Sequence, residues 1–304
     1  MSRPVSLSVV VICRDESDRI AACLESVHGW ADEIIVLDSG STDGTARIAR
    51  RYTDKVWITD WPGYGPQRNR ALAKASGDWV MTLDADERVT PELREAIDRA
   101  LSDPAFDANL VKVPWRMICF GKALRHGRYT SPQTRLFRRE GARYRDDQVH
   151  ESLVIPNRKV AVLDAPLEHH SWRDYQHLQR KHVEYAWLLA RQKYQQGQRS
   201  NLAYASFRFL TDFVIQYFFR LCLLDGARGF LMSLVLAQYA FHKYAALWSL
   251  EVEEKLRLSA SVPPAVVPPR RSRRSVSVSA PRPRGYVAPT IREAPSQVSQ
   301  NHAA

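Results

Sequence analysis

Residues 80–88 read VMTLDADER, an apolar run that stops abruptly at three carboxylates. The unbroken apolar segment predicts a strand over residues 79–83 that is buried on both faces. Asp84 and Asp86 follow at its carboxyl end, and a spacing of two in extended chain points both side chains the same way. Two such carboxylates repel each other unless a cation or a proton lies between them. The segment therefore predicts a buried strand that ends in a site for positive charge.

The sequence on either side of this strand alternates between strand and helix patterns. Residues 7–12, LSVVVI, form another continuous β-branched run. Thr90 and Pro91 are a typical N-cap and first residue of a helix. Four strand–helix units of this kind predict a parallel, doubly wound α/β sheet. Strands are expected at residues 7–12, 33–37, 56–59 and 79–83, and helices at 20–27, 42–51, 67–75 and 91–101.

The next part of the chain extends this domain. Residues 110–167 contain shorter strand-like pieces joined by loops rich in Gly, Arg and Asp. They suit a mixed extension of the sheet and complete a catalytic α/β domain over residues 1–171.

Residues 172–257 read as helices. Residues 203–224 and 229–249 are apolar and aromatic, but charged residues interrupt both stretches. A bilayer span takes about 20 mostly apolar residues, so neither stretch is a good transmembrane helix. Two alternatives stay equally open: a pair of interfacial helices that lies on a membrane, and an ordinary helical hairpin packed on the α/β domain.

The charge and the cysteines limit the location and the partners. The formal net charge is +11, but residues 261–304 alone hold seven arginines and one glutamate. Residues 258–304, rich in Pro, Ser and Arg, predict a disordered basic tail, which suits contact with an anionic membrane. No nucleic acid is expected as a partner of the folded part. The four scattered cysteines and the lack of an export signal predict a cytoplasmic address.

Polar segments also follow or precede the other predicted strands. Residues 14–16 read RDE after the first strand, and residues 38–45 read DSGSTDGT after the second. Residues 66–69, PQRN, open the helix before the fourth strand. Ligands of open parallel sheets bind outside the carboxyl ends of the strands. We therefore expect these segments and Asp84 to meet at one edge of the sheet. In the alternative interpretation, each segment is only a turn or a helix cap and binds no ligand.

The segments CRDES, VLDSGSTDGT, GPQRNRALAKASGDW and LDADE, in this order and spacing, resemble the nucleotide-sugar-binding half of a family 2 glycosyltransferase of GT-A fold. The segments QVHESL and LEHHSW, followed by apolar helices, resemble more narrowly the lipopolysaccharide core β-glucosyltransferases. The resemblance implies a UDP-sugar donor and a divalent cation, Mg²⁺ or Mn²⁺, bound through carboxylate and phosphate oxygens.

The same resemblance implies roles for single residues. Asp38 would contact the base or ribose, Asp84 the ribose, and Asp86 the metal that bridges the phosphates. Arg68 would contact phosphate or Asp84, although Gln67 replaces the small residue of the family pattern. The other implied substrate-binding residues are Arg14, Glu16, Ser41, Asp43 and His150.

Acid–base chemistry needs a group that takes the proton of the acceptor hydroxyl. The family pattern His-Glu matches His150 and Glu151, so Glu151 is the first choice for the base, with Asp147 as the reserve. The later pair His169 and His170 would complete the metal site. Neighbouring residues on a strand point to opposite faces, so one of them is expected at the metal, and the pattern favours His169.

Some side chains are expected to contact the acceptor. Arg125, His126 and Arg128 lie in a loop that would grip an anionic acceptor or form a solvated turn. Trp61, Trp115 and Trp172 would stack on sugar rings or belong to the core.

The resemblance thus implies an inverting, metal-dependent hexosyltransferase. It would move a sugar, with glucose preferred, to a lipid-linked glycan such as the lipopolysaccharide inner core, at the cytoplasmic face of a bacterial inner membrane. The alternatives are a non-catalytic protein that binds nucleic acid or membrane, and another nucleotide-using transferase.

Overall fold

The computed structural model describes residues 3–128, 131–145 and 152–260. The chain divides into two compact units, Met1–Ser259 and Ala260–Ala304. The predicted basic tail lies almost entirely outside the described residues and stays a prediction.

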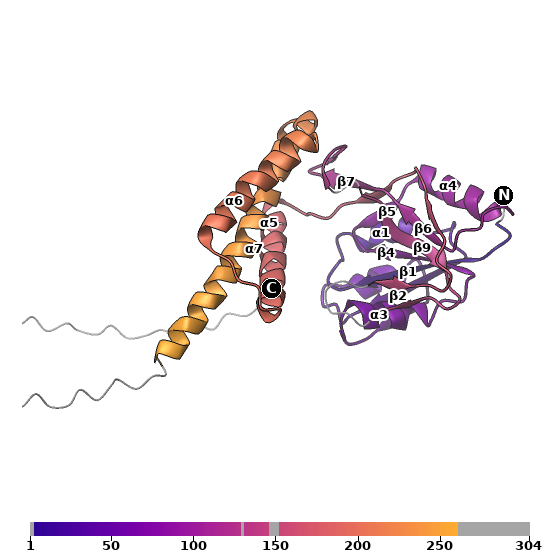
Figure 1. Cartoon of the computed structure of the whole chain (residues 1–304). Helices are drawn as coiled ribbons and strands as arrows, with labels where there is room; N and C mark the ends of the chain where they lie inside the picture. Colours follow the sequence, from indigo (N-terminus) through magenta and orange to yellow (C-terminus); the bar gives the residue numbers. More distant parts are fainter. Residues whose placement is uncertain (1–2, 129–130, 146–151, 261–304) are drawn as a thin grey trace, which may run out of the picture. The chain divides into compact units, whose positions relative to one another are not determined.

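A seven-stranded sheet forms the centre of the first unit, in the order β12-β6-β9-β4-β1-β2-β3 (Figure 1). All neighbouring pairs are parallel except those of β9, which runs antiparallel to β4 and β6. The predicted α/β class with a largely parallel sheet and a mixed extension is therefore confirmed. The strands are β1 Leu7–Cys13, β2 Glu33–Asp38, β3 Val56–Ile58, β4 Trp79–Asp84, β6 Leu110–Val113, β9 Gln133–Arg138 and β12 Val160–Val162.

Helices cover both faces of this sheet, with α1 and α4 on one side and α3 on the other (Figure 1). Alternate residues of β1 feed the two cores: Val9 and Val11 pack with α1 and α4, while Val10 packs with α3. This two-sided burial explains why the strands read as unbroken apolar runs. The Thr90 hydroxyl accepts the Leu93 amide as the predicted N-cap of α4. The helices are α1 Ile20–Glu25, α2 Thr45–Ala49, α3 Tyr64–Leu72 and α4 Pro91–Ser102.

A second, four-stranded sheet has the order β5-β13-β7-β8. Only two residues separate its first strand, β5, from the end of β4, and β5 pairs antiparallel with β13, so that Glu87 lies opposite His169. The segment after residue 160 is thereby brought back to the acidic end of β4. The strands are β5 Glu87–Val89, β7 Trp115–Cys119, β8 Lys122–Ala123 and β13 Leu167–His169, and a separate pair is β10 Arg143–Tyr144 with β11 Leu153–Val154.

The C-terminal part of the first unit is helical, as predicted. The helices α5 and α7 meet through His182 and Tyr239, and α6 and α7 through Tyr204 and Tyr244, whose ring centroids are 4.8 Å apart. Within the described residues, no helix combines the length and the apolar character that crossing a bilayer requires. The helices are α5 Tyr175–Gln195, α6 Leu202–Val214 with its π-helical continuation η2 Ile215–Phe219, the 3-10 turn η3 Cys222–Asp225, and α7 Gly226–Ala260.

The predicted boundary between residues 171 and 172 falls in the link from β13 to α5, inside one compact unit. The division of that unit into a catalytic and a helical domain stays a prediction.

Candidate active site

The carboxyl ends of β1, β2 and β4 lie side by side. Cys13 of β1 pairs with Asp38 of β2, and Ile12 pairs with Asp84 of β4. The register therefore places the predicted polar segments at one edge of the sheet, as expected for a ligand site of a parallel sheet.

The loops after β1 and β2 are held together by hydrogen bonds between them. The Asp15 amide donates to the Ser41 hydroxyl at 2.8 Å, and the Ser17 amide donates to the Asp43 carboxylate at 2.9 Å. Burial acts to raise the pKa of Asp43, but hydrogen bonds from Thr45 and Ser17 hold that pKa well below its usual range. Ser41 and Asp43 thus shape the loop pair, and Arg14 stands exposed on the same loop.

Asp38 is fully buried in this arrangement. One carboxylate oxygen accepts the Ser41 amide at 2.6 Å, and the other lies 3.8 Å from the Cys13 sulfur. Asp38 holds the loop after β2, and its predicted contact with the base or the ribose stays a prediction.

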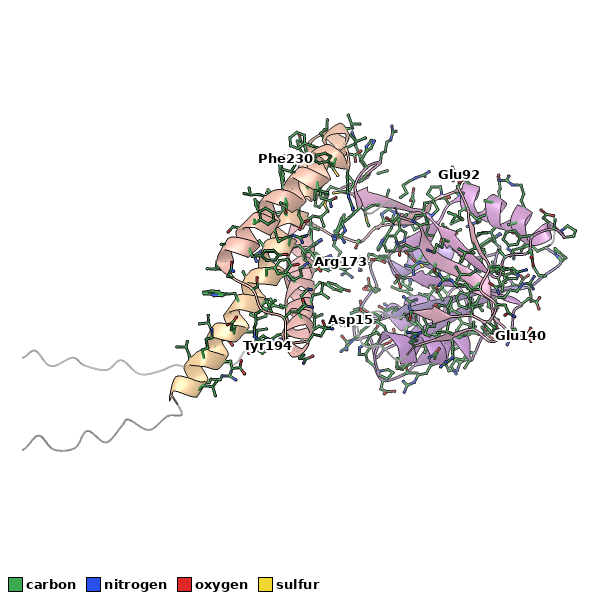
Figure 2. The ribbon with its side chains drawn as sticks, viewed as in Figure 1. Asp15, Glu92, Glu140, Arg173, Tyr194 and Phe230 are labelled. Atoms are coloured by element: carbon green, nitrogen blue, oxygen red, sulfur yellow. The ribbon has the colours of Figure 1, made fainter. Side chains whose placement is uncertain are left out.

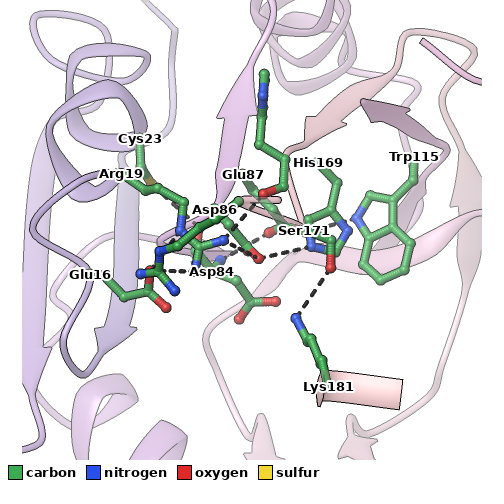
Figure 3. Close-up of polar contacts among 12 residues, drawn as sticks. Glu16, Arg19, Cys23, Asp84, Asp86, Glu87, Trp115, His169, Ser171 and Lys181 are labelled. Atoms are coloured by element: carbon green, nitrogen blue, oxygen red, sulfur yellow. Dashed lines mark hydrogen bonds and ion pairs between the residues drawn. The ribbon is translucent and has the colours of Figure 1, made fainter. Parts of the chain in front are cut away.

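The two aspartates of the LDADE segment do not face the same way through extended chain, and that part of the prediction is wrong. Asp84 is the last residue of β4, but Ala85 and Asp86 form a turn before β5. The two carboxylates consequently have different partners: Asp84 contacts Arg68, whereas Asp86 contacts His169, and Figure 3 shows the second of these contacts.

Asp84 belongs to a cluster of buried charges. Arg68 contacts one of its oxygens at 2.9 Å and Arg135 the other at 2.8 Å. Burial acts to raise the pKa of Asp84, but the charges of Arg135 and Arg68 hold that pKa well below its usual range. The predicted Arg68–Asp84 contact is present. Asp84 is therefore a fixed carboxylate whose remaining lone pairs can accept hydroxyl groups.

Arg135 also neutralises Glu87, which has no exposed surface. Its guanidinium contacts one Glu87 oxygen at 2.6 Å, and the Trp115 indole N–H donates to the same oxygen at 2.7 Å. The second Glu87 oxygen accepts the Asp84 amide at 2.9 Å. Burial nevertheless raises the pKa of Glu87. Glu87 is thus the buried support that fixes the turn carrying Asp86.

Asp86 meets His169 on the other side of the turn. One carboxylate oxygen of Asp86 lies 3.3 Å from His169 Nε2 and 3.6 Å from a nitrogen of Arg19. The ring of His169 packs on Trp115 with a centroid separation of 4.5 Å. His170 instead contacts Glu168. The His170 backbone amide donates to the Asp86 carbonyl at 2.8 Å, but the imidazole that contacts the Asp86 carboxylate is that of His169. Residues 84–86 are called the acidic turn below (Figure 3).

The Asp86–His169 pair fits a divalent cation. The Asp86 oxygen and the His169 nitrogen lie 3.3 Å apart on two nearly buried side chains, and a carboxylate and an imidazole are groups that would hold such an ion together. Within the described ranges, no cluster of three or more His, Cys, Asp or Glu side chains is arranged for a metal. Two protein ligands suffice where substrate phosphates complete the shell. The imidazole favours Mn²⁺ over Mg²⁺, which prefers oxygen ligands.

Glu16 lies next to this pair. Its carboxylate contacts Arg19 at 2.8 Å and Arg173 at 3.1 Å, and burial raises its pKa in spite of both arginines. Arg173 also donates to the Asp15 carbonyl, and both residues are labelled in Figure 2. The predicted substrate residue Glu16 therefore ties the loop after β1 to the segment that follows β13.

A cavity of about 420 Å³ opens beside Asp84. Arg68, Arg135 and Arg158 line it, together with Trp115 and Tyr144. Arg68 and Arg135 already contact Asp84. The three guanidinium groups together therefore leave this cavity with an excess of positive charge. Its chemistry suits an anionic group such as a diphosphate.

Three predicted residues, Asp147, His150 and Glu151, lie outside the described residues, so their roles stay predictions. Conversely, sequence reasoning missed Arg19, Glu87 as a buried support, and Arg135. An arginine within the apolar part of TRLFRR is a signal of a buried counter-charge, but its partners become evident only once β9 lies beside β4.

Known proteins similar to this chain place it in a family. A model of glycosyl transferase family 2 matches residues 8–155. The lipopolysaccharide core biosynthesis glycosyltransferase LpsC of Rhizobium meliloti is 31% identical over 250 residues, which cover 80% of this chain and 92% of that protein. The chain belongs to glycosyltransferase family 2. This family membership favours the predicted transferase over a non-catalytic binding protein.

Two further similar proteins match this chain over very different lengths. An uncharacterised glycosyltransferase of Rickettsia typhi is 27% identical over 264 residues, which cover 82% of this chain and 89% of that protein. A crystal structure of glucosyl-3-phosphoglycerate synthase from Mycobacterium tuberculosis, in complex with Mn²⁺ and UDP-glucose, is 31% identical, and its match covers 37% of this chain and 44% of that one, with a TM-score of 0.33. This chain spans less than half of that structure.

Proposed function

We propose that this glycosyltransferase transfers a hexose, with glucose preferred, from a UDP-sugar to a lipid-linked glycan of the lipopolysaccharide inner-core type, with inversion at the anomeric carbon. The observation that carries the proposal is the Asp86–His169 pair at the end of β4, 3.3 Å apart and beside a cavity lined by three arginines. The similarity to a protein named for lipopolysaccharide core biosynthesis supports a glycan acceptor.

The donor half of the mechanism rests on the buried charge cluster. Arg68 and Arg135 keep Asp84 ionised and fixed, so that its free lone pairs can accept the ribose hydroxyls. The arginine-lined cavity offers charged donors to the diphosphate. Asp86 and His169 would hold Mn²⁺ or Mg²⁺, which when bound supplies charge stabilisation for the UDP leaving group.

The acceptor half needs a base and an in-line attack. The acceptor hydroxyl oxygen forms a bond to the anomeric carbon while the bond from that carbon to the UDP oxygen breaks, and the electron pair leaves with the diphosphate. The hydroxyl proton passes to a carboxylate. Glu151 is our proposed base, with Asp147 as the reserve, on the strength of the family pattern.

Nucleotide selectivity provides the direct test of this function. We expect UDP-glucose with Mn²⁺ to raise the melting temperature of the full chain, and to do so more than GDP-glucose or dTDP-glucose, because binding to the folded state alone stabilises it. Mg²⁺ should support a smaller rise than Mn²⁺. A thermal-shift panel of the three nucleotide sugars with each ion measures this. Equal shifts with and without metal would contradict the proposed site.

We further propose that the enzyme contacts an anionic membrane from the cytoplasmic side through α6 and the turns that follow it. This segment exposes a series of large apolar side chains, among them Phe207, Leu210, Phe218, Phe219 and Leu224. An apolar helix face of this kind suits insertion at the boundary between lipid headgroups and acyl chains.

Positive charge borders the same surface. Arg220 is exposed after the π-helical turn, and its carbonyl accepts the Gly127 amide at 3.1 Å. Asp225 accepts the backbone amides of Arg125 and His126, which holds the loop with the exposed Arg125 against the helix tip. Cations beside exposed apolar side chains match the charge of anionic headgroups.

A paired charge substitution tests the membrane surface. Phe219→Glu combined with Leu224→Glu should reduce sedimentation with phosphatidylglycerol-containing vesicles at least about tenfold, because each change removes roughly 1.5–3 kcal/mol of apolar burial. The matched control is Leu256→Glu with Leu258→Glu, at two similarly exposed positions near the end of α7. Equal losses in both double variants would show that α6 has no special part in membrane contact.

A further inference from the structure

A second pocket, of about 280 Å³, lies on the His169 side of the acidic turn. Its wall combines aromatic rings from Trp172, Tyr185 and Tyr239 with the cations Lys181 and Arg128. The pocket is thus built from the link after β13, from α5 and α7, and from the loop that precedes β9. No acidic side chain of the described residues lines it.

The pocket adjoins the proposed reaction centre through two residues. Ser171 lines the pocket and follows His169 by only two positions. The Lys181 ammonium donates to the Ser171 hydroxyl at 3.2 Å, and Figure 3 shows this contact next to the His169 ring. Ser171 and Lys181 of the pocket wall therefore lie close to the Asp86–His169 pair. Asp84, the first carboxylate of the same turn, lines the arginine-lined cavity.

The wall of the pocket matches an anionic sugar. Aromatic side chains with a few charged groups are the usual lining of small-ligand sites, and the volume is near the lower end of the ~300–1,000 Å³ found for them. An ammonium and a guanidinium form strong hydrogen bonds with phosphate or carboxylate. An ammonium has three donor positions, and the Ser171 contact uses one of them. Trp172 is almost fully buried and keeps one wall rigid, while Tyr185 is exposed at the rim.

We infer that this pocket is the acceptor subsite, and that it binds a sugar residue bearing a phosphate or a carboxylate. The inference rests on the proposed glycosyl transfer and adds the chemical class of the acceptor. The donor diphosphate occupies the cavity on the Asp84 side, and the acceptor sugar approaches from the Lys181 side. The hexose is transferred from the donor to the acceptor at the acidic turn.

Direct binding measurements on the full chain test the inference without the need for turnover. Glucose 6-phosphate, glucuronate and uncharged glucose serve as probes in saturation-transfer NMR titrations, with UDP and diamagnetic Mg²⁺ present. We expect at least one anionic sugar to bind about tenfold or more tightly than glucose, since a charged hydrogen bond contributes that much. Preference for glucose 6-phosphate would assign a phosphorylated acceptor, and preference for glucuronate an acidic sugar.

Variants assign the binding to this pocket. Lys181→Gln combined with Arg128→Gln should weaken binding of the anionic sugar at least tenfold, and Tyr185→Ala, which keeps both charges, should weaken all three sugars. Arg180→Gln is the matched control, because Arg180 is exposed one position away on the same helix and does not line the pocket. Melting curves confirm that each variant is folded.

The outcomes separate this inference from the proposed function. Glucose binding as tightly as the anionic sugars, or unchanged binding in the double variant, would overturn the acceptor subsite. Failure of the wild-type chain to bind UDP with Mn²⁺ would instead overturn the proposed function, whatever the sugars do.

Discussion

Asp86→Asn is expected to weaken Mn²⁺-dependent binding of UDP about 100-fold or more, and to reduce transfer from UDP-glucose at least as much. Loss of groups that merely orient metal ligands already costs about 10–100-fold in affinity or activity, and Asp86 is the charged member of the pair that it forms with His169. The signal of free Mn²⁺ in electron paramagnetic resonance, titrated with protein and UDP, measures the binding. Radiolabelled UDP-glucose measures the transfer.

This variant is expected to remain folded. Arg19 keeps its contact with Glu16, and an asparagine oxygen can still accept a hydrogen bond from His169. The matched control is Asp107→Asn, because Asp107 is an exposed aspartate before β6 that pairs with Lys159. Mn²⁺ and UDP binding of wild-type strength in Asp86→Asn would remove the metal assignment, and an equal loss in Asp107→Asn would show that the effect is not local.

Arg135→Met should lower the free energy of unfolding by about 3–5 kcal/mol, the usual cost of removing one partner of a buried ion pair. Methionine fills much of the space but leaves the fully buried Glu87 without its counter-charge. Asp84 still has Arg68, so Glu87 bears most of the loss. Urea unfolding followed by circular dichroism measures the change.

A second substitution distinguishes charge from packing. In Arg135→Met with Glu87→Gln, the buried charge is gone and the single amide oxygen can accept from either Trp115 or the Asp84 amide, which bond different oxygens of Glu87, so only part of the stability should return. Arg143→Met, an exposed arginine on β10, should change stability by less than about 0.5 kcal/mol. If the double variant is as unstable as the sum of its single changes, the loss comes from packing and not from the unpaired charge.

The order of strands and helices could be predicted because strands that are buried on both faces of a sheet consist of unbroken apolar runs. β1 and β4 read as unbroken apolar runs, and Thr90 marks the start of α4. Helix α2 begins at Thr45, later than predicted, because Thr42 and Asp43 are engaged by the loop after β1. The place of β9 between β4 and β6 could not be predicted, since a short strand carries no record of its neighbours.

The candidate site was predictable where it depends on strand ends, and less so where it depends on long-range pairing. The register brings Asp38 and Asp84 to one edge, as expected. The turn at Ala85, which separates the two aspartates, is held locally by the bond from the Asp84 amide to Glu87 and at long range by the pairing of β5 with β13, and the second contact cannot be seen in the local sequence. Arg135 reaches Glu87 across 48 positions of the chain, a contact that no spacing rule contains.

The pairing of β5 with β13 determines how late in synthesis the proposed metal site can form. The carboxylates of the acidic turn leave the ribosome more than eighty residues before His169, whose strand closes the second sheet. Manganese affinity should therefore arise late in synthesis, after the parallel strands have docked, since distant segments associate only after the loop between them has closed. A stalled nascent chain that ends before β13 would contain Asp86 but not His169, and we expect it to bind manganese weakly.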